Sequence, residues 1–290
     1  MWRGRRWGTQ TRRAQRQTNT FGAAAGATIY HTNENRDVLG SVSSSNDWQW
    51  AAYGKHPVAK DFVSMGGQLP LVKTLSGWID KGFELVRSQR DRPPRFCSWR
   101  FWVSGGSGDN LSCGLLRDSR DGAGRAYPLL ILLNGSLDHW KEHWDLLPFA
   151  CERVWNHMEQ ATVKMYDSLR GMEIELERIP PPSPMWAEYS TDKEALCGVQ
   201  TASGNERLRE AVTAIEHQAQ SLGNATELYL PLQQWPSIDP MAIVGCWHSL
   251  LKAQQPSVPN VVFMGGTPAD VSLVIFKRPL TINDFVRLWG

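Results

Sequence analysis

The sequence predicts an α/β fold, a three-layer sandwich in which helices flank both faces of a central mixed β-sheet. Segments with strand-like and helix-like periodicity alternate along residues 48–290, which favours a layered sheet over an all-helical or all-β fold. Residues 126–133 are apolar at successive positions, as expected of a central strand covered on both faces. With 41% apolar residues among 290, the chain can form one large core or two modest ones.

Residues 1–47 are polar and rich in Gly and Ser, and they show no sustained period, so we expect a disordered tail. Residues 1–20 hold six Arg and no acidic residue. The arginine pairs in this segment are also compatible with an export signal, which is the alternative to a disordered tail. The whole chain carries +2, so the remaining residues are mildly acidic and no nucleic-acid groove is expected. No apolar run approaches the roughly 20 residues of a membrane span, so membrane insertion is not expected.

Order is expected from Trp48, because Trp48, Trp50 and Ala52 alternate with other residues as in a strand. The apolar spacing of Leu75, Ile79 and Phe83 then predicts a helix over 71–87. A charged loop over 90–95 and strands over 96–103, 111–116 and 126–133 complete this half.

The second half begins with a predicted helix over 148–169. Four prolines in residues 179–184 predict an extended connector, and a lobe boundary near residue 180 is possible. Further helices are predicted after a capping box at Ser203, after Asp239-Pro240 and after Thr281. Strands are predicted over 225–230, 261–264 and 271–276, the last two as neighbours.

The five cysteines show no C-x-x-C spacing, which fits reduced thiols in a cytoplasmic protein better than a disulfide framework. The 14 tryptophans are expected mainly in the core.

Two segments suggest chemistry. His139 and His143 would share a face if their segment were helical, and two such histidines can bind a metal ion. The alternative function is therefore a metal-dependent hydrolase that uses His139, Glu142 and His143. Gly54-Lys55 suggests a nucleotide-sensing turn, but the earlier glycine of a phosphate loop is missing and His56 replaces its Ser or Thr. We therefore expect neither a cofactor nor a bound metal.

Three motifs follow one another in residues 53–129. They are an aromatic-Gly-Lys turn leading to Asp-Phe, a Trp-Arg-Phe strand, and a Ser-x-Asp turn leading through Gly-Arg to an aromatic-Pro-Leu segment. In this order they resemble the type VI secretion-associated family called TagF or ImpM. The matching residues include Tyr53, Gly54, Lys55, Pro57, Asp61, Phe62, Trp99, Arg100, Phe101, Gly114, Ser119, Asp121, Gly124, Arg125, Tyr127, Pro128 and Leu129.

The resemblance implies a three-layer α/β sandwich and a bacterial cytoplasmic accessory protein that is not an enzyme. Members of the family resemble post-translational repressors of the secretion machine. The resemblance further implies a link to threonine phosphorylation and contact with a scaffold protein that bears a forkhead-associated domain.

The motif residues also suggest one site. We predict that Lys55, Asp61, Arg100, Asp121 and Arg125 form a polar cluster at a sheet edge, because each lies at a turn or strand of the motifs. The residues predicted to support interaction are Gly54, Lys55, Pro57, Asp61, Phe62, Trp99, Arg100, Phe101, Asp121, Gly124, Arg125 and Pro128.

Overall fold

The structure is a computed structural model that describes residues 48–89, 96–106, 108–202, 210, 213–217, 225–233, 239–255 and 257–290. Residues 47–290 form one compact unit. The predicted tail over 1–47, the charged loop over 90–95 and most of the helix predicted after Ser203 lie outside the described residues.

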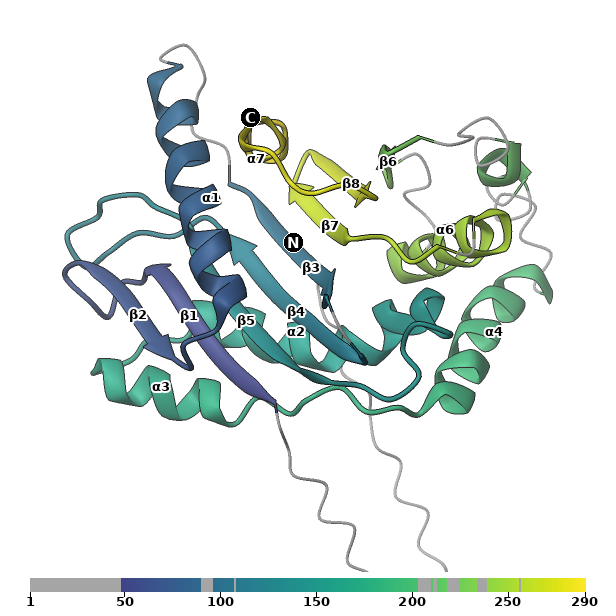
Figure 1. Cartoon of the computed structure of the whole chain (residues 1–290), viewed down its shortest axis with the longest axis horizontal. Helices are drawn as coiled ribbons and strands as arrows, with labels where there is room; N and C mark the ends of the chain where they lie inside the picture. Colours follow the sequence, from purple (N-terminus) through teal and green to yellow (C-terminus); the bar gives the residue numbers. More distant parts are fainter. Residues whose placement is uncertain are drawn as a thin grey trace, which may run out of the picture. The chain divides into compact units, whose positions relative to one another are not determined.

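Within the described residues, eight strands form one sheet in the order β2-β1-β5-β4-β3-β7-β8-β6 (Figure 1). The strands are β1 (Gln49–Lys55), β2 (Phe62–Gly66), β3 (Ser98–Ser104), β4 (Asn110–Arg117), β5 (Leu129–Ser136), β6 (Glu227–Pro231), β7 (Val261–Thr267) and β8 (Asp270–Phe276). Strands from both sides of the proline-rich connector near residue 180 share this sheet, because β3 pairs with β7.

Every strand pairing among the described residues is antiparallel, so the prediction of a mixed sheet was wrong in this detail. Short loops join β1 to β2, β3 to β4 and β7 to β8, and short loops permit only antiparallel neighbours.

Helices cover both faces of the sheet, which confirms the predicted three layers (Figure 1). One face packs against α1 (Pro70–Ser88) and α7 (Ile282–Trp289). The other packs against α2 (Leu147–Val163), α3 (Leu169–Glu177), α4 (Trp186–Ala202) and α6 (Pro240–Gln254).

Strand β5 shows why both layers form. Its residues Leu129, Ile131 and Leu133 enter the core under α2, while Leu130 and Leu132 enter the core under α1. Since successive side chains of a strand point to opposite faces, a run of apolar residues requires cover on both sides. The predicted central position of this strand is confirmed.

Helix boundaries were predicted well where a cap was present. Asp239 accepts a hydrogen bond from the Met241 N–H at the start of α6, and Thr281 forms a capping box with Asp284 at the start of α7. The helix predicted over 148–169 instead ends at Val163, because Lys164 is extended and Ser168 caps a separate α3. No pattern in the sequence predicted α4 or β2.

The tryptophans mostly fill the two cores. Buried examples are Trp78, Trp99, Trp102, Trp140, Trp144, Trp155, Trp247 and Trp289. Cys113 and Cys151 are free thiols. Among the described residues, no helix has the length and apolar character needed to cross a membrane.

Candidate functional site

Two loops meet at the end of the β1–β2 hairpin. The loop over 56–61 joins β1 to β2, and the loop over 118–128 joins β4 to β5 (Figure 1). The Gly122 N–H donates to the Ala59 carbonyl at 2.6 Å, and Arg125 Nη2 donates to the Lys60 carbonyl at 2.6 Å. Segments about 60 residues apart in sequence are therefore held in one place.

The carboxylate of Asp121 is the centre of this contact. Lys55 Nζ lies 2.9 Å and Arg125 Nε lies 2.7 Å from its Oδ2 atom. The N–H groups of Ala123 and Arg125 donate to Oδ1 at 3.0 and 2.9 Å. Burial alone would raise the pKa of Asp121, but the hydrogen bonds from Lys55 and Arg125 outweigh it and hold this pKa well below its usual range. The buried group is thus a charged, fully bonded carboxylate.

Gly54 permits the close approach of β1 and β5 at this end. Its φ is +126°, and a Cβ built on it would lie 2.0 Å from the carbonyl oxygen of Pro128. Only glycine fits such a conformation and such a contact. Gly124 has a φ of +81° in the second loop, but no atom lies within 4 Å of where its Cβ would stand.

An aromatic group lies beside the ion cluster. The Phe62 ring is 4.6 Å from that of Tyr127, centroid to centroid, and Lys55 Nζ lies 5.0 Å from the centre of the Phe62 ring. Tyr53 and Tyr127 both donate their hydroxyl protons to Asp80 of α1, the Tyr53 bond being 2.9 Å long. Phe62 remains 48% exposed.

The structure brings together four of the five residues predicted to form the polar cluster: Lys55, Asp61, Asp121 and Arg125. Asp61 is on the outside, 73% exposed and 3.7 Å from Arg125. The inclusion of Arg100 was wrong. Arg100 lies on β3, which β1, β5 and β4 separate from β2, and its guanidinium binds Glu159 and Asn156 of α2 instead.

The other predicted residues divide between the loops and the core. Pro57 is exposed in the first loop, and Pro128 accepts a hydrogen bond from the Lys55 N–H at 3.4 Å. Trp99 and Phe101 are buried under α7, where Trp99 Nε1 donates to the Leu288 carbonyl at 3.1 Å. These two side chains are unavailable to a partner.

Comparison with known families identifies the region that contains both loops. The profile of the TagF N-terminal domain, described as type VI secretion system-associated, matches residues 51–179. Residues 51–179 are thus similar to a TagF N-terminal domain. This region extends from β1 to the end of α3 and includes Asp121 and all of its partners.

A crystal structure of PA0076 from Pseudomonas aeruginosa PAO1 aligns with a TM-score of 0.49 and 16% sequence identity, over 83% of this chain and 94% of that chain. No curated protein sequence gave a significant match.

The histidine segment of the TagF-like region does not have the geometry that the hydrolase alternative needs. Residues 138–143 form turns, and His139 has a left-handed backbone with a φ of 58°. The ring of His143 stacks on Trp186 at 5.1 Å. In the part of the chain that the structure describes, no group of three or more His, Cys, Asp or Glu is placed to hold a metal ion.

The Gly54-Lys55 segment, at the end of β1, does not form a phosphate loop. Lys55 is only 7% exposed, and its ammonium group is paired with Asp121 and covered by Phe62. A phosphate loop needs a free lysine and converging N–H groups.

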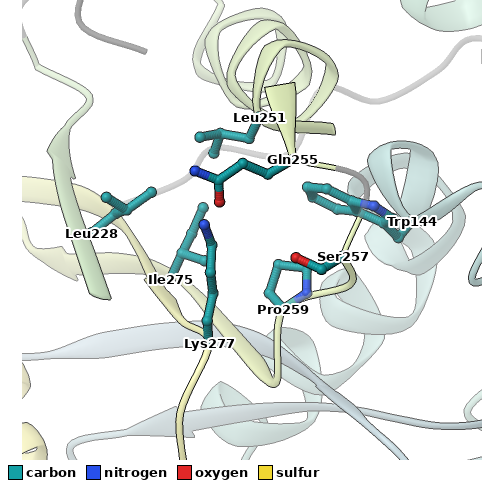
Figure 2. Close-up of a pocket in the computed structure, with 8 residues that line it drawn as sticks. All are labelled: Trp144, Leu228, Leu251, Gln255, Ser257, Pro259, Ile275 and Lys277. Carbon is teal, nitrogen blue, oxygen red and sulfur yellow. The ribbon is translucent and has the colours of Figure 1, made fainter. Parts of the chain in front are cut away.

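Figure 2 shows a small pocket. Most of the residues that line it lie outside residues 51–179, which match the TagF N-terminal domain. Its lining residues are Trp144, Leu228, Leu251, Gln255, Ser257, Pro259, Ile275 and Lys277. Its cavity volume is about 10 Å³. Small-molecule sites usually enclose roughly 300–1,000 Å³, so this pocket is far too small for a substrate site.

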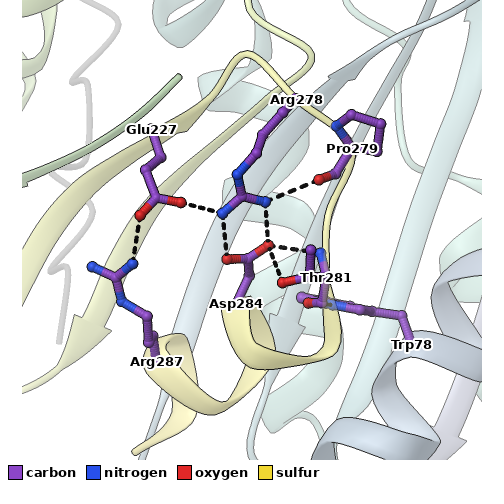
Figure 3. Close-up of polar contacts among 7 residues, drawn as sticks. All are labelled: Trp78, Glu227, Arg278, Pro279, Thr281, Asp284 and Arg287. Atoms are coloured by element: carbon purple, nitrogen blue, oxygen red, sulfur yellow. Dashed lines mark hydrogen bonds and ion pairs between the residues drawn. The ribbon is translucent and has the colours of Figure 1, made fainter. Parts of the chain in front are cut away.

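A second ion network was missed by the sequence analysis (Figure 3). Arg278 pairs with Asp284 at 2.7 Å and also with Glu227, while Arg287 pairs with Glu227 at 2.7 Å. Trp78 Nε1 donates to the Thr281 carbonyl at 2.7 Å. The two arginines balance the charges of the two carboxylates, and their ion pairs connect α7 to β6. The hydrogen bond from Trp78 connects the start of α7 to α1.

Proposed function

We propose that this protein is a non-catalytic accessory regulator of a bacterial type VI secretion system. In this proposal it represses the machine after translation, in the cytoplasm, through contact with a scaffold protein that bears a forkhead-associated domain. The match of residues 51–179 to the TagF N-terminal domain, which is associated with type VI secretion, supports the assignment to this secretion system.

The observation that carries the proposal is the state of Asp121. Its charge is balanced by Lys55 and Arg125, and it accepts two further backbone hydrogen bonds. A carboxylate held in this way is a poor base, since its pKa lies far below neutral pH. The arrangement instead fixes two exposed loops, which is what a protein-binding surface requires.

Deletion of the gene in the host, with secreted effector measured in the medium, tests this function. We expect more secreted effector in the deletion strain and a return to the original level when the gene is restored. Unchanged or reduced secretion in the deletion strain would contradict repression. Co-purification of the scaffold with this protein, compared between wild type and a strain lacking the scaffold, tests the partner separately.

A further inference from the structure

The exposed part of the two loops has a distinct charge. We name it the turn surface and define it by Lys60, Asp61, Phe62, Arg120 and Arg125, all of which are exposed. Lys55 and Asp121 lie beneath it, and the Asp121 carboxylate pairs with Lys55 and also with Arg125 of the surface. Three cationic side chains and one carboxylate remain at the surface, although residues 21–290 as a whole are acidic.

Two of these cations, Lys60 and Arg120, have no ion pair in the described part of the chain. Arg125 is bound through Nε to the buried Asp121 at 2.7 Å, and its outer pair with Asp61 is long, at 3.7 Å. Exposed pairs of this kind contribute little stability and exchange easily for a partner's charges.

The turn surface also offers an apolar contact. Phe62 is 48% exposed, yet Tyr127 packs against its ring at 4.6 Å, and this contact restricts its motion. An aromatic ring that is already held in place loses little entropy on binding and is typical of the centre of a protein interface.

We infer that the turn surface binds an acidic segment of a partner protein, whose carboxylates pair with Lys60, Arg120 and Arg125 around an apolar contact on Phe62. This inference rests on the proposed function, and it names the chemistry of the partner at the site. Charge complementarity also argues against one other occupant: residues 1–20 of this chain hold six arginines and no acid, so they have the same sign as the surface.

Site-specific photocrosslinking in the host tests the inference. The probe is benzoylphenylalanine placed at Ala123, an exposed residue of the second loop, and the same probe at Ala253 of α6 is the control. After irradiation, the crosslinked peptide is identified by mass spectrometry. We expect the Ala123 probe to capture a segment of a secretion-system protein with clustered Asp and Glu, and the Ala253 probe not to capture it.

Charge reversal provides an independent measurement. With the captured protein as titrant, the double variant Lys60→Glu/Arg120→Glu is expected to bind about tenfold more weakly than the wild type. The matched control Lys73→Glu/Arg153→Glu changes the net charge by the same amount at exposed positions elsewhere and is expected to bind within about twofold.

Several outcomes would overturn the inference. They are capture of a segment without clustered acids, capture of a second copy of this chain, no capture from Ala123, and equal loss of affinity in both double variants. The proposed function fails separately: if deletion leaves secretion unchanged while Ala123 still captures an acidic segment, the surface is correctly described and the regulatory role is wrong.

Discussion

At the scale of single residues, the site depends on positions that tolerate one side chain only. Gly54 lets the backbone N–H of Lys55 and the Pro128 carbonyl approach each other, because any Cβ at residue 54 would overlap the Pro128 oxygen. Asp121 of the neighbouring loop then fixes the side-chain ammonium group of Lys55. The two requirements are independent, since the first concerns the backbone and the second concerns charge.

The substitution Gly54→Ala should lower the free energy of unfolding by about 2–4 kcal/mol, since it adds both a disallowed φ and a clash. Chemical denaturation followed by tryptophan fluorescence measures this change. Gly77→Ala is the control: Gly77 lies within α1 with open space around its Cβ position, so alanine there should stabilise the protein by about 0.5–1 kcal/mol. Equal effects at the two positions would refute the account of Gly54.

His248 should make stability depend on pH. It is fully buried, and burial lowers its pKa from 6.5 to about 4 despite the hydrogen bond from Nδ1 to the Val244 carbonyl. The unfolded chain therefore binds a proton on His248 below pH 6.5 while the folded chain does not until about pH 4. Stability should fall by at most about 3 kcal/mol as the pH decreases through this window.

Denaturation curves at several pH values between 7 and 4 measure this dependence. His248→Phe should flatten the dependence, whereas His217→Gln, at an exposed position, should leave it unchanged. An unaltered slope in His248→Phe would show that other groups are responsible.

At the scale of elements, β3 and α2 are joined by Arg100. Its side chain is 4% exposed, and Nε and Nη2 donate to the two carboxylate oxygens of Glu159 at 2.7 and 2.9 Å. A bidentate pair of this kind positions the helix on the sheet as well as balancing the charges. It is remote in the sheet from the turn surface, so its role should be structural.

Arg100→Met should therefore cost about 2–4 kcal/mol of stability, because it leaves the partly buried Glu159 without its counterion. The double variant Arg100→Met/Glu159→Leu should recover part of this loss in the same denaturation assay. Affinity for the turn-surface partner should stay within about twofold of the wild type. A tenfold loss of affinity in the stable double variant would show that Arg100 belongs to the binding site.

Some of the strands and helices could be predicted from the sequence, and others could not. The pattern of β5 predicted a central strand because side chains alternate strictly between the two faces, and caps at Asp239 and Thr281 predicted helix starts because they satisfy specific N–H groups. Helix α4 has no such signal, since its apolar residues do not recur on one face. Lys55, Asp61, Asp121 and Arg125 could be grouped because turns bring them to one sheet end. The position of Arg100 depends on strand order, which the motifs do not specify.

At the scale of the whole molecule, the described residues form one sheet with a core on each face, and the turn surface lies at one end of its first hairpin. The buried charges at this end are paired with each other and with Arg125, while the exposed Lys60 and Arg120 have no ion pair among the described residues. A rigid loop pair with an excess of positive charge suits recognition of another protein, and it supplies no activated nucleophile of its own.

The most direct test of this account is the amount of effector secreted by a deletion strain that carries one of two plasmid-borne variants. Both variants are first shown to be as stable and abundant as the wild type. We predict that Lys73→Glu/Arg153→Glu restores low secretion and that Lys60→Glu/Arg120→Glu leaves secretion high. Full repression by Lys60→Glu/Arg120→Glu would contradict the claim that this protein acts through its turn surface.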